Sequence, residues 1–267
     1  MSKKVHLLSI DPQNDFCDPT GNLYVTNAEK DMNNLAEMII RLTDNHKLDD
    51  IHVTLDSHQL GHIANPMFWQ DKNCNHPKPF TAITVSDVEN GIWGPIFPHW
   101  RDKFLGYLRS LENNKRYIHV IWPPHCIIGS WGHSIYPCVE KAIQYWAYKE
   151  KAFVDYVAKG SNPWTEHFSA VKADVPDNDP STQINSRLID ILNNADIILI
   201  TGEALSHCVA NTIRDIANEF GDDNIKKFFL VEDTTSSVTG FEKMGEDFVN
   251  EMVSKGMNIV NSKTVLA

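Results

Sequence analysis

The 267-residue chain has few of the features that mark secreted, membrane-spanning or nucleic-acid-binding proteins. Its five cysteines are irregularly spaced and form no Cys-x-x-Cys pair, which favours reduced thiols in a cytosol over a disulfide framework. No apolar run could span a bilayer, and Asp11 interrupts the first apolar segment too early for a signal peptide. A formal net charge of −11 argues against a nucleic-acid or membrane partner, which would need a basic face. We therefore expect a cytoplasmic protein with a small-molecule partner.

What the sequence does contain is a regular alternation of strand and helix patterns. With 42% hydrophobic and 22% charged residues, the chain is long enough for one large α/β domain or two small ones. The predicted strands are 5–10, 51–55, 118–122, a weaker 153–157, 197–201, 228–231 and 259–260. The predicted helices are 28–43, about 100–111, 139–148, 184–192, one after Cys208 and about 241–253. Such alternation predicts βαβ units and a parallel sheet with helices on both faces.

One region, at about 63–117, interrupts this alternation with many prolines and aromatic residues, including Trp69, Trp93 and Trp100. So many large apolar groups are costly to leave exposed. They could pack on the edge of the sheet, or they could form a lid or a subunit contact. We interpret the region as an insertion within a single domain (1–267) that serves at least partly as an interface, and we expect a homo-oligomer.

Reactive side chains stand at the carboxyl ends of five predicted strands. They are Asp11, Asp56 with His58, His125, Lys159 and Cys208. Any one of them alone is weak evidence, because an aspartate after a strand is usually a turn residue or a helix cap. In a parallel sheet, however, all five ends lie along one edge, where ligands bind in open α/β folds. The pattern therefore predicts a site at this edge.

Cys208 lies where an apolar strand ends near Gly202 and a helical pattern begins. At the N-terminus of a helix, the backbone N–H groups and the helix dipole favour thiolate over thiol, which would make Cys208 a nucleophile. The other interpretation is a small buried residue that packs the helix on the sheet. This segment alone does not decide between the two.

The motifs together resemble the nicotinamidase branch of the isochorismatase-like cysteine hydrolases. The matching pieces are Asp11-x-Gln13-Asn14-Asp15-Phe16, Asp56-x-His58-x-x-x-His62, Trp122-Pro-Pro-His125-Cys126-x-x-Gly129-Ser130, Lys159-Gly160 with Glu166-His-Phe-Ser169, and Gly202-x-Ala204-x-Ser-His-Cys208-Val. They follow the family's order between Val5 and about Val231, and the insertion lies outside them. The resemblance implies a three-layer αβα sandwich with a mainly parallel six-stranded sheet.

The resemblance also implies a catalytic triad in which Cys208 is the nucleophile, Asp11 the general base and Lys159 the residue that orients and activates both. A carboxylate beside an ammonium and a thiol accepts the thiol proton and passes it to the leaving amine, so that an acyl-thioester forms. By analogy with the family, a cis peptide precedes Ala204, and the N–H groups of Ala204 and Cys208 form the oxyanion hole.

Substrate and metal contacts follow from the same resemblance. Phe16 and Trp122 match positions that sandwich the aromatic ring; ordinary core packing is the other interpretation of both. Asp56, His58 and His125 form a ligand set that suits one divalent ion, zinc first, with iron or manganese as alternatives. In the family the pyridine nitrogen of the substrate meets this metal. His62 could be a fourth ligand, a plain loop histidine or a residue that supports the ligands; we favour the last, since three protein ligands leave room for substrate.

Some residues depart from the family pattern or compete for a role. Ser57, Gln59 and Glu203 stand where the family commonly has an aromatic residue, a proline and an apolar residue. Lys149 and Lys151 compete with Lys159, which we prefer because it ends a strand before a glycine. The resulting hypothesis is an amidohydrolase that converts nicotinamide to nicotinate and ammonia, as in NAD salvage. The alternatives are a metal-independent relative that acts on another small amide, and an inactive scaffold.

Overall fold

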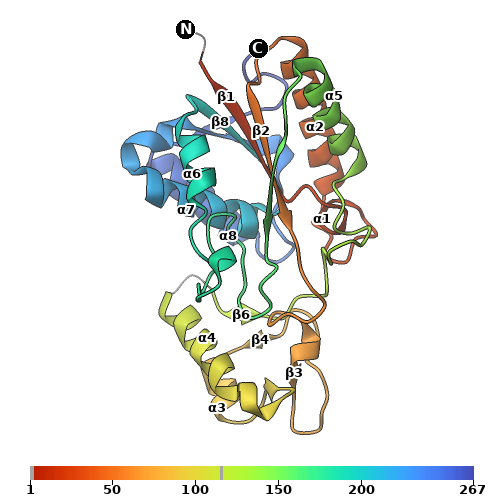
Figure 1. The fold of residues 1–267 in the computed structure, drawn as a ribbon, viewed down its shortest axis with the longest axis vertical. Coiled ribbons are helices and arrows are strands. Elements are labelled where there is room, and N and C mark those ends of the chain that lie inside the picture. Colours follow the sequence, from red (N-terminus) through yellow and green to blue (C-terminus); the bar gives the residue numbers. More distant parts are fainter. Residues whose placement is uncertain (1–2, 115–116) are drawn as a thin grey trace.

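The computed structural model describes residues 3–114 and 117–267, and its centre is one parallel β-sheet (Figure 1). The six strands are β1 (Val5–Ile10), β2 (Asp50–Asp56), β7 (Asp155–Lys159), β8 (Ile197–Gly202), β9 (Phe228–Val231) and β10 (Asn258–Val260). Their order across the sheet is β10-β9-β8-β1-β2-β7, and every neighbouring pair is parallel. The predicted α/β class with a parallel six-stranded sheet is confirmed.

Helices cover both faces of this sheet, which gives the predicted three layers (Figure 1). On one face lie α2 (Ala28–Asp44) and α5 (Pro137–Glu150); on the other lie α6 (Ser186–Asn193), α7 (Ala210–Phe220) and α8 (Glu242–Ser254). Successive strand side chains point to opposite faces, so Leu7 packs in the core under α2 and α5 while Leu8 packs under the other three helices. Among residues 3–114 and 117–267, no helix is both long enough and apolar enough to cross a membrane.

The predicted strand at 118–122 is not part of the main sheet. Only β6 (His119–Val120) forms there, and it pairs antiparallel with β4 (Ala82–Ile83). The next backbone N–H groups are also bonded within this region, from Ile121 to Thr81 and from Trp122 to Ala64. The place beside β2 is taken by β7, and Pro123 and Pro124, which have no N–H to donate, end the segment.

The predicted insertion folds as a lobe at the carboxyl end of the sheet, seen below it in Figure 1. The predicted range contains β3 (Trp69–Gln70), β4, α3 (Val85–Glu89), β5 (Gly94–Pro95) and α4 (Arg101–Asn114), and the lobe extends beyond that range to β6. The aromatic residues have a core of their own, centred on Trp69, Phe104 and Leu108, which explains why the sequence has so many of them here. Short elements complete the chain: α1 (Asn14–Cys17), η1 (Pro66–Phe68), η2 (Pro98–Trp100), η3 (Pro180–Thr182), η4 (Leu205–Val209), η5 (Asp222–Lys227) and η6 (Glu232–Thr234).

Candidate active site

Asp11 directly follows β1 and is completely buried. Its backbone N–H donates to the Thr54 carbonyl at 3.2 Å, and the Thr54 hydroxyl donates to Asp11 Oδ1. Gln13, two residues on, ties this turn to the end of β2: its side-chain amide donates to the Asp56 carbonyl at 2.8 Å and accepts from the Asp56 N–H at 2.7 Å. The Asp11-x-Gln13 piece therefore fixes the ends of two neighbouring strands, and with them two carboxylates.

Cys208 lies beyond the end of β8, as the sequence predicts, but in a different kind of turn. Residues Leu205–Val209 form the short π-helix η4, which continues into α7. A cis peptide joins Glu203 and Ala204, as the resemblance implies. Gly202, at the end of β8, has a φ of 108°, and a Cβ atom there would lie 1.9 Å from the Ile10 carbonyl oxygen, so only glycine fits.

Lys159, the last residue of β7, joins the other predicted catalytic residues. Its ammonium nitrogen lies 2.9 Å from Asp11 Oδ2, 3.0 Å from Asp56 Oδ1 and 3.6 Å from Cys208 Sγ, and it donates to the His167 carbonyl at 3.1 Å. The side chain is only 1% exposed. The competing Lys149 instead pairs with Asp44 on the surface, and Lys151 lies over the Tyr148 ring. The structure thus brings Asp11, Lys159 and Cys208 together.

Burial sets the protonation of this group. Burial raises the pKa of the Cys208 thiol well above its ordinary value, although the Lys159 charge opposes this. Burial also raises the pKa of Asp11, again against Lys159. For Lys159 burial disfavours the charge, but Asp11 and Asp56 outweigh it and hold the pKa well above its usual range. Burial therefore favours the neutral thiol of Cys208 over the thiolate, and the nearby ammonium of Lys159 favours the thiolate.

The three predicted metal ligands also converge. Asp56 ends β2, and its Oδ2 lies 3.0 Å from His58 Nε2 and 3.3 Å from His125 Nε2. The other nitrogen of each ring donates to a backbone carbonyl, His58 Nδ1 to Gly160 at 3.0 Å and His125 Nδ1 to Pro123 at 2.8 Å. In the neutral rings each Nε2 then carries a lone pair that faces a carboxylate oxygen, an arrangement that a cation between them satisfies. The residues fit a divalent metal.

Gly160 leaves the space that the side chains of His58 and Asp56 occupy. Its φ is 81°, and a Cβ atom there would lie 2.8 Å from His58 Cε1 and 2.9 Å from Asp56 Oδ1. A larger residue would therefore displace the carboxylate and the imidazole together. This contact gives a physical reason for the Lys-Gly pair at the end of β7.

His62 is not placed as a fourth ligand. Its Nδ1 accepts from the Ala64 N–H at 3.1 Å and its Nε2 donates to the Thr165 carbonyl at 3.1 Å, so both nitrogens are occupied. Its ring lies against the His58 ring, with 4.6 Å between centroids. His62 thus supports the position of a proposed ligand by packing, without a hydrogen bond to it.

A small cavity connects the nucleophile with the metal residues. It is lined by Phe16, Leu23, Asp56, Trp122, His125, Glu166, Phe168, Ala204, His207, Cys208 and Val238. Both predicted ring-binding residues, Phe16 and Trp122, reach it, and so does Ala204 of the predicted oxyanion hole. Cys126, the other thiol near the site, does not line this cavity; its backbone N–H donates to Asp15 Oδ2 at 2.6 Å.

Glu166 is a further polar residue on the cavity wall, beyond the predicted site residues. This carboxyl is 4% exposed, and within the described residues its Oε2 has no hydrogen-bond partner. Burial raises its pKa, against the charge of His58. An unpartnered polar atom on a cavity wall is a contact for substrate, water or cation. The sequence already marked this residue, because Glu166 begins the Glu166-His-Phe-Ser169 stretch that matches the family.

The insertion supplies one wall of the approach to this cavity. A second cavity, of about 450 Å³, is lined by Phe80 and Tyr117 from that region and by Ile118 and Val120 just after it. It shares Trp122, Glu166, Phe168 and His207 with the smaller one. The Phe80 ring stands edge-on to Trp122 at 5.8 Å. The lobe therefore contributes to the surroundings of the site, beyond filling an edge of the sheet.

Comparisons with known proteins find nicotinamidases by both sequence and fold. The chain is 25% identical over 256 residues to the nicotinamidase of Saccharomyces cerevisiae, covering 96% of this chain and 98% of that protein. Among solved structures, an Acinetobacter baumanii nicotinamidase/pyrazinamidase has a TM-score of 0.67 at 20% identity, with both chains covered completely. The yeast nicotinamidase bound to the inhibitor nicotinaldehyde has a TM-score of 0.65 at 19% identity, covering 96% and 99% of the two chains.

A more distant structure is a zinc complex. The pyrazinamidase of Pyrococcus horikoshii has a TM-score of 0.55 at 18% identity, with 97% of this chain and 99% of that chain covered. No protein-family model matches the sequence. Together the comparisons confirm the resemblance to the nicotinamidase branch that the motifs indicate, and the chain has the isochorismatase-like fold.

Proposed function

We propose that this protein is an amidohydrolase that converts nicotinamide to nicotinate and ammonia, with Cys208 as nucleophile and with the assistance of a metal. The similarity to nicotinamidases supports the amidohydrolase activity. The observation that carries the mechanism is the position of Lys159, whose ammonium contacts Asp11, Asp56 and Cys208; Asp56 and Cys208 in turn line one cavity. The cavity has a volume of only about 20 Å³, so its walls would have to move apart for an amide to lie beside the nucleophile and the metal residues at once.

Asp11 begins the reaction by accepting the Cys208 proton. Lys159 stabilises the negative charge as it moves from the carboxylate to the sulfur, which compensates for the high pKa of the buried thiol. The sulfur then adds to the amide carbonyl, and the N–H groups of Ala204 and Cys208 receive the developing oxyanion. Asp11 returns the proton to the departing amine, ammonia leaves, and water activated by Asp11 hydrolyses the acyl-thioester to nicotinate.

Asp56, His58 and His125 would hold one divalent ion, zinc first, which when bound supplies a Lewis-acid contact for the ring nitrogen. The donor set of one carboxylate and two imidazoles supports this choice, and a zinc complex is known for the structural relative from Pyrococcus horikoshii. Phe16 and Trp122 hold the ring by its faces, and the geometry of the amide over Cys208 follows from this positioning.

The first test is ammonia release from nicotinamide by the purified chain, compared with Asp11→Asn, which should lower turnover by about 10²–10⁴-fold because it removes the proton acceptor. The second test uses nicotinaldehyde, the inhibitor bound in the yeast structure. The Cys208 thiol should add to this aldehyde to give a tetrahedral adduct that resembles the reaction intermediate, so inhibition should be strong and should require Cys208. Absence of ammonia release, or equal inhibition by benzaldehyde, would contradict the proposal.

A further inference from the structure

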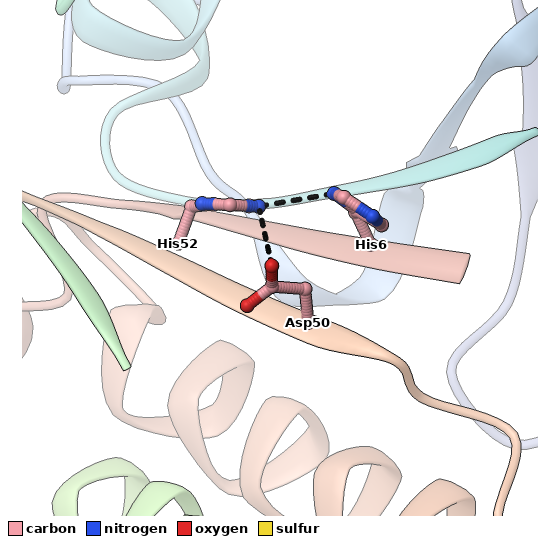
Figure 2. A group of neighbouring side chains, drawn as sticks. All are labelled: His6, Asp50 and His52. Carbon is pink, nitrogen blue, oxygen red and sulfur yellow. Dashed lines mark hydrogen bonds and ion pairs between the residues drawn. The ribbon is translucent and has the colours of Figure 1, made fainter. Parts of the chain in front are cut away.

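A second group of metal-ligating side chains lies at the opposite end of β1 and β2 from the catalytic residues. It consists of His6 on β1 and Asp50 and His52 on β2 (Figure 2). His6 is the register partner of Asp50, and His52 stands two residues further on, so all three side chains point to the same face of the sheet. The pairing of the two strands therefore creates a cluster that no sequence motif predicts.

Both imidazoles are removed from solvent. His6 is 6% exposed, and the side chain of His52 is 1% exposed. Burial of polar rings in a strand is costly unless their nitrogens have partners. His52 Nδ1 donates to Asp155 Oδ2 at 3.0 Å, and Arg187 from α6 holds the other Asp155 oxygen at 2.8 Å. This carboxylate–histidine contact is the one that orients metal-binding histidines, and it leaves the lone pair of His52 Nε2 directed into the cluster.

The atoms that face one another have the spacing of a coordination shell. His52 Nε2 lies 3.1 Å from His6 Nδ1 and 3.9 Å from Asp50 Oδ2, and the three atoms all lie within 4.8 Å of one another. Ligands bound to zinc at about 2.0–2.2 Å in a tetrahedron are about 3.3–3.6 Å apart. The two imidazole nitrogens are already close to that spacing, and the Asp50 oxygen would have to move toward them to complete the shell. The Asp50 side chain is about one-third exposed (36%), which gives an entry path and an open coordination position.

We propose that His6, Asp50 and His52 form a second metal site, for a zinc-class divalent cation, separate from the catalytic cavity. Without the cation, a neutral His52 whose Nδ1–H donates to Asp155 would accept from His6 Nδ1–H across the 3.1 Å contact. When the cation binds, the His6 proton moves from Nδ1 to Nε2, both facing nitrogens become ligands, and Asp50 supplies the negative charge. Such an ion would cross-link the beginnings of β1 and β2, so its role would be to stabilise the sheet.

The test is the number of zinc ions held by the full-length chain after metal removal and equilibrium dialysis. We expect two per wild-type chain and one in His6→Gln, while His125→Ala should lose the other ion and keep this one. His46→Gln is the matched control, because His46 belongs to the same end of the molecule but is 69% exposed and pairs with Glu150. One ion in wild type, lost in His125→Ala, would overturn the second site and leave the catalytic one intact.

Two milder variants keep the test valid if His6→Gln fails to fold. Asp50→Asn keeps the shape of a ligand but removes its charge, and should weaken binding at this site alone. Asp155→Asn leaves all three ligands and should weaken binding by about 10–100-fold, through loss of the orientation of His52. In the His125→Ala background, zinc should raise the melting temperature of the protein, and Asp50→Asn should reduce that rise. Unchanged affinity in both variants would contradict the assignment.

Discussion

Replacing Lys159 with methionine removes the cation that Asp11, Asp56 and Cys208 share. Methionine fills a similar volume, so the loss is mainly of charge. Without the ammonium, which now lowers the pKa of Asp11 against the effect of burial, this carboxyl should hold its proton at higher pH and fail as a base. Cys208 also loses the charge that stabilises its thiolate. We therefore expect turnover on nicotinamide to fall by about 10²–10⁴-fold, the usual contribution of general acid–base catalysis.

The same substitution should destabilise the fold in a pH-dependent way. Removing one partner of a buried ion pair costs about 3–5 kcal/mol, because the remaining charge stays buried. Burial already raises the pKa of Asp11, so the folded state favours its neutral form. The free energy of unfolding therefore falls as pH rises through the pKa of Asp11 in the folded state. Loss of Lys159 should raise this pKa further and make the fall larger. The melting temperature of Lys159→Met should therefore drop more between mildly acidic and mildly alkaline pH than that of wild type.

The assay measures ammonia release and thermal unfolding on the same preparations. Lys149→Met is the matched control, because Lys149 pairs with Asp44 on the surface and should change both quantities little. Turnover near the wild-type level in a folded Lys159→Met variant would refute the reasoning and move the role to another residue. A melting temperature that falls equally at all pH values would refute the electrostatic part alone.

Three further predictions follow from the site. Cys208→Ala should fold normally and lose essentially all turnover, and alkylation with peptide mapping should link inactivation to Cys208; inactivation that tracks Cys126 would make the triad assignment wrong. Chelation, or His125→Ala, should abolish nicotinamide hydrolysis, and benzamide should be a substrate poorer than nicotinamide by about 10²-fold or more. His62→Ala should weaken metal binding only about 10–100-fold. Full activity of the metal-free enzyme would favour the metal-independent alternative. Burial and the nearby Asp31 raise the pKa of Glu203 well above its ordinary value. The contribution of Glu203 to the free energy of unfolding is therefore fully present below the pKa of the unfolded state and is lost as pH rises through the pKa of the folded state. Glu203→Gln should therefore melt higher than wild type at alkaline pH in a thermal scan, and an unchanged difference across pH would count against a buried neutral Glu203.

The alternation of strands and helices along the chain, and the placement of reactive residues at strand ends, were determined by the sequence itself. Apolar runs such as 5–10 and 197–201 correspond to β1 and β8 because fully buried parallel strands have no polar face to alternate with. Parallel strands all end at one edge, so Asp11, Lys159 and Cys208 lie along that edge. The strand order β8-β1-β2-β7 then brings them together. The turn glycines Gly160 and Gly202 reflect close approaches that tolerate no side chain.

Other properties were decided only by the tertiary structure, because they depend on atoms far apart in the chain. Burial under several elements raises the pKa of the Cys208 thiol, and the strand-to-helix pattern of the sequence does not reveal this burial. His62 is occupied by two backbone groups that the fold brings to it, so its spacing from His58 could not decide its role. The segment 118–122 reads as a strand, yet its hydrogen bonds go to the insertion. The cluster of His6, Asp50 and His52 exists only because the register of β1 and β2 places three separate polar residues on one face.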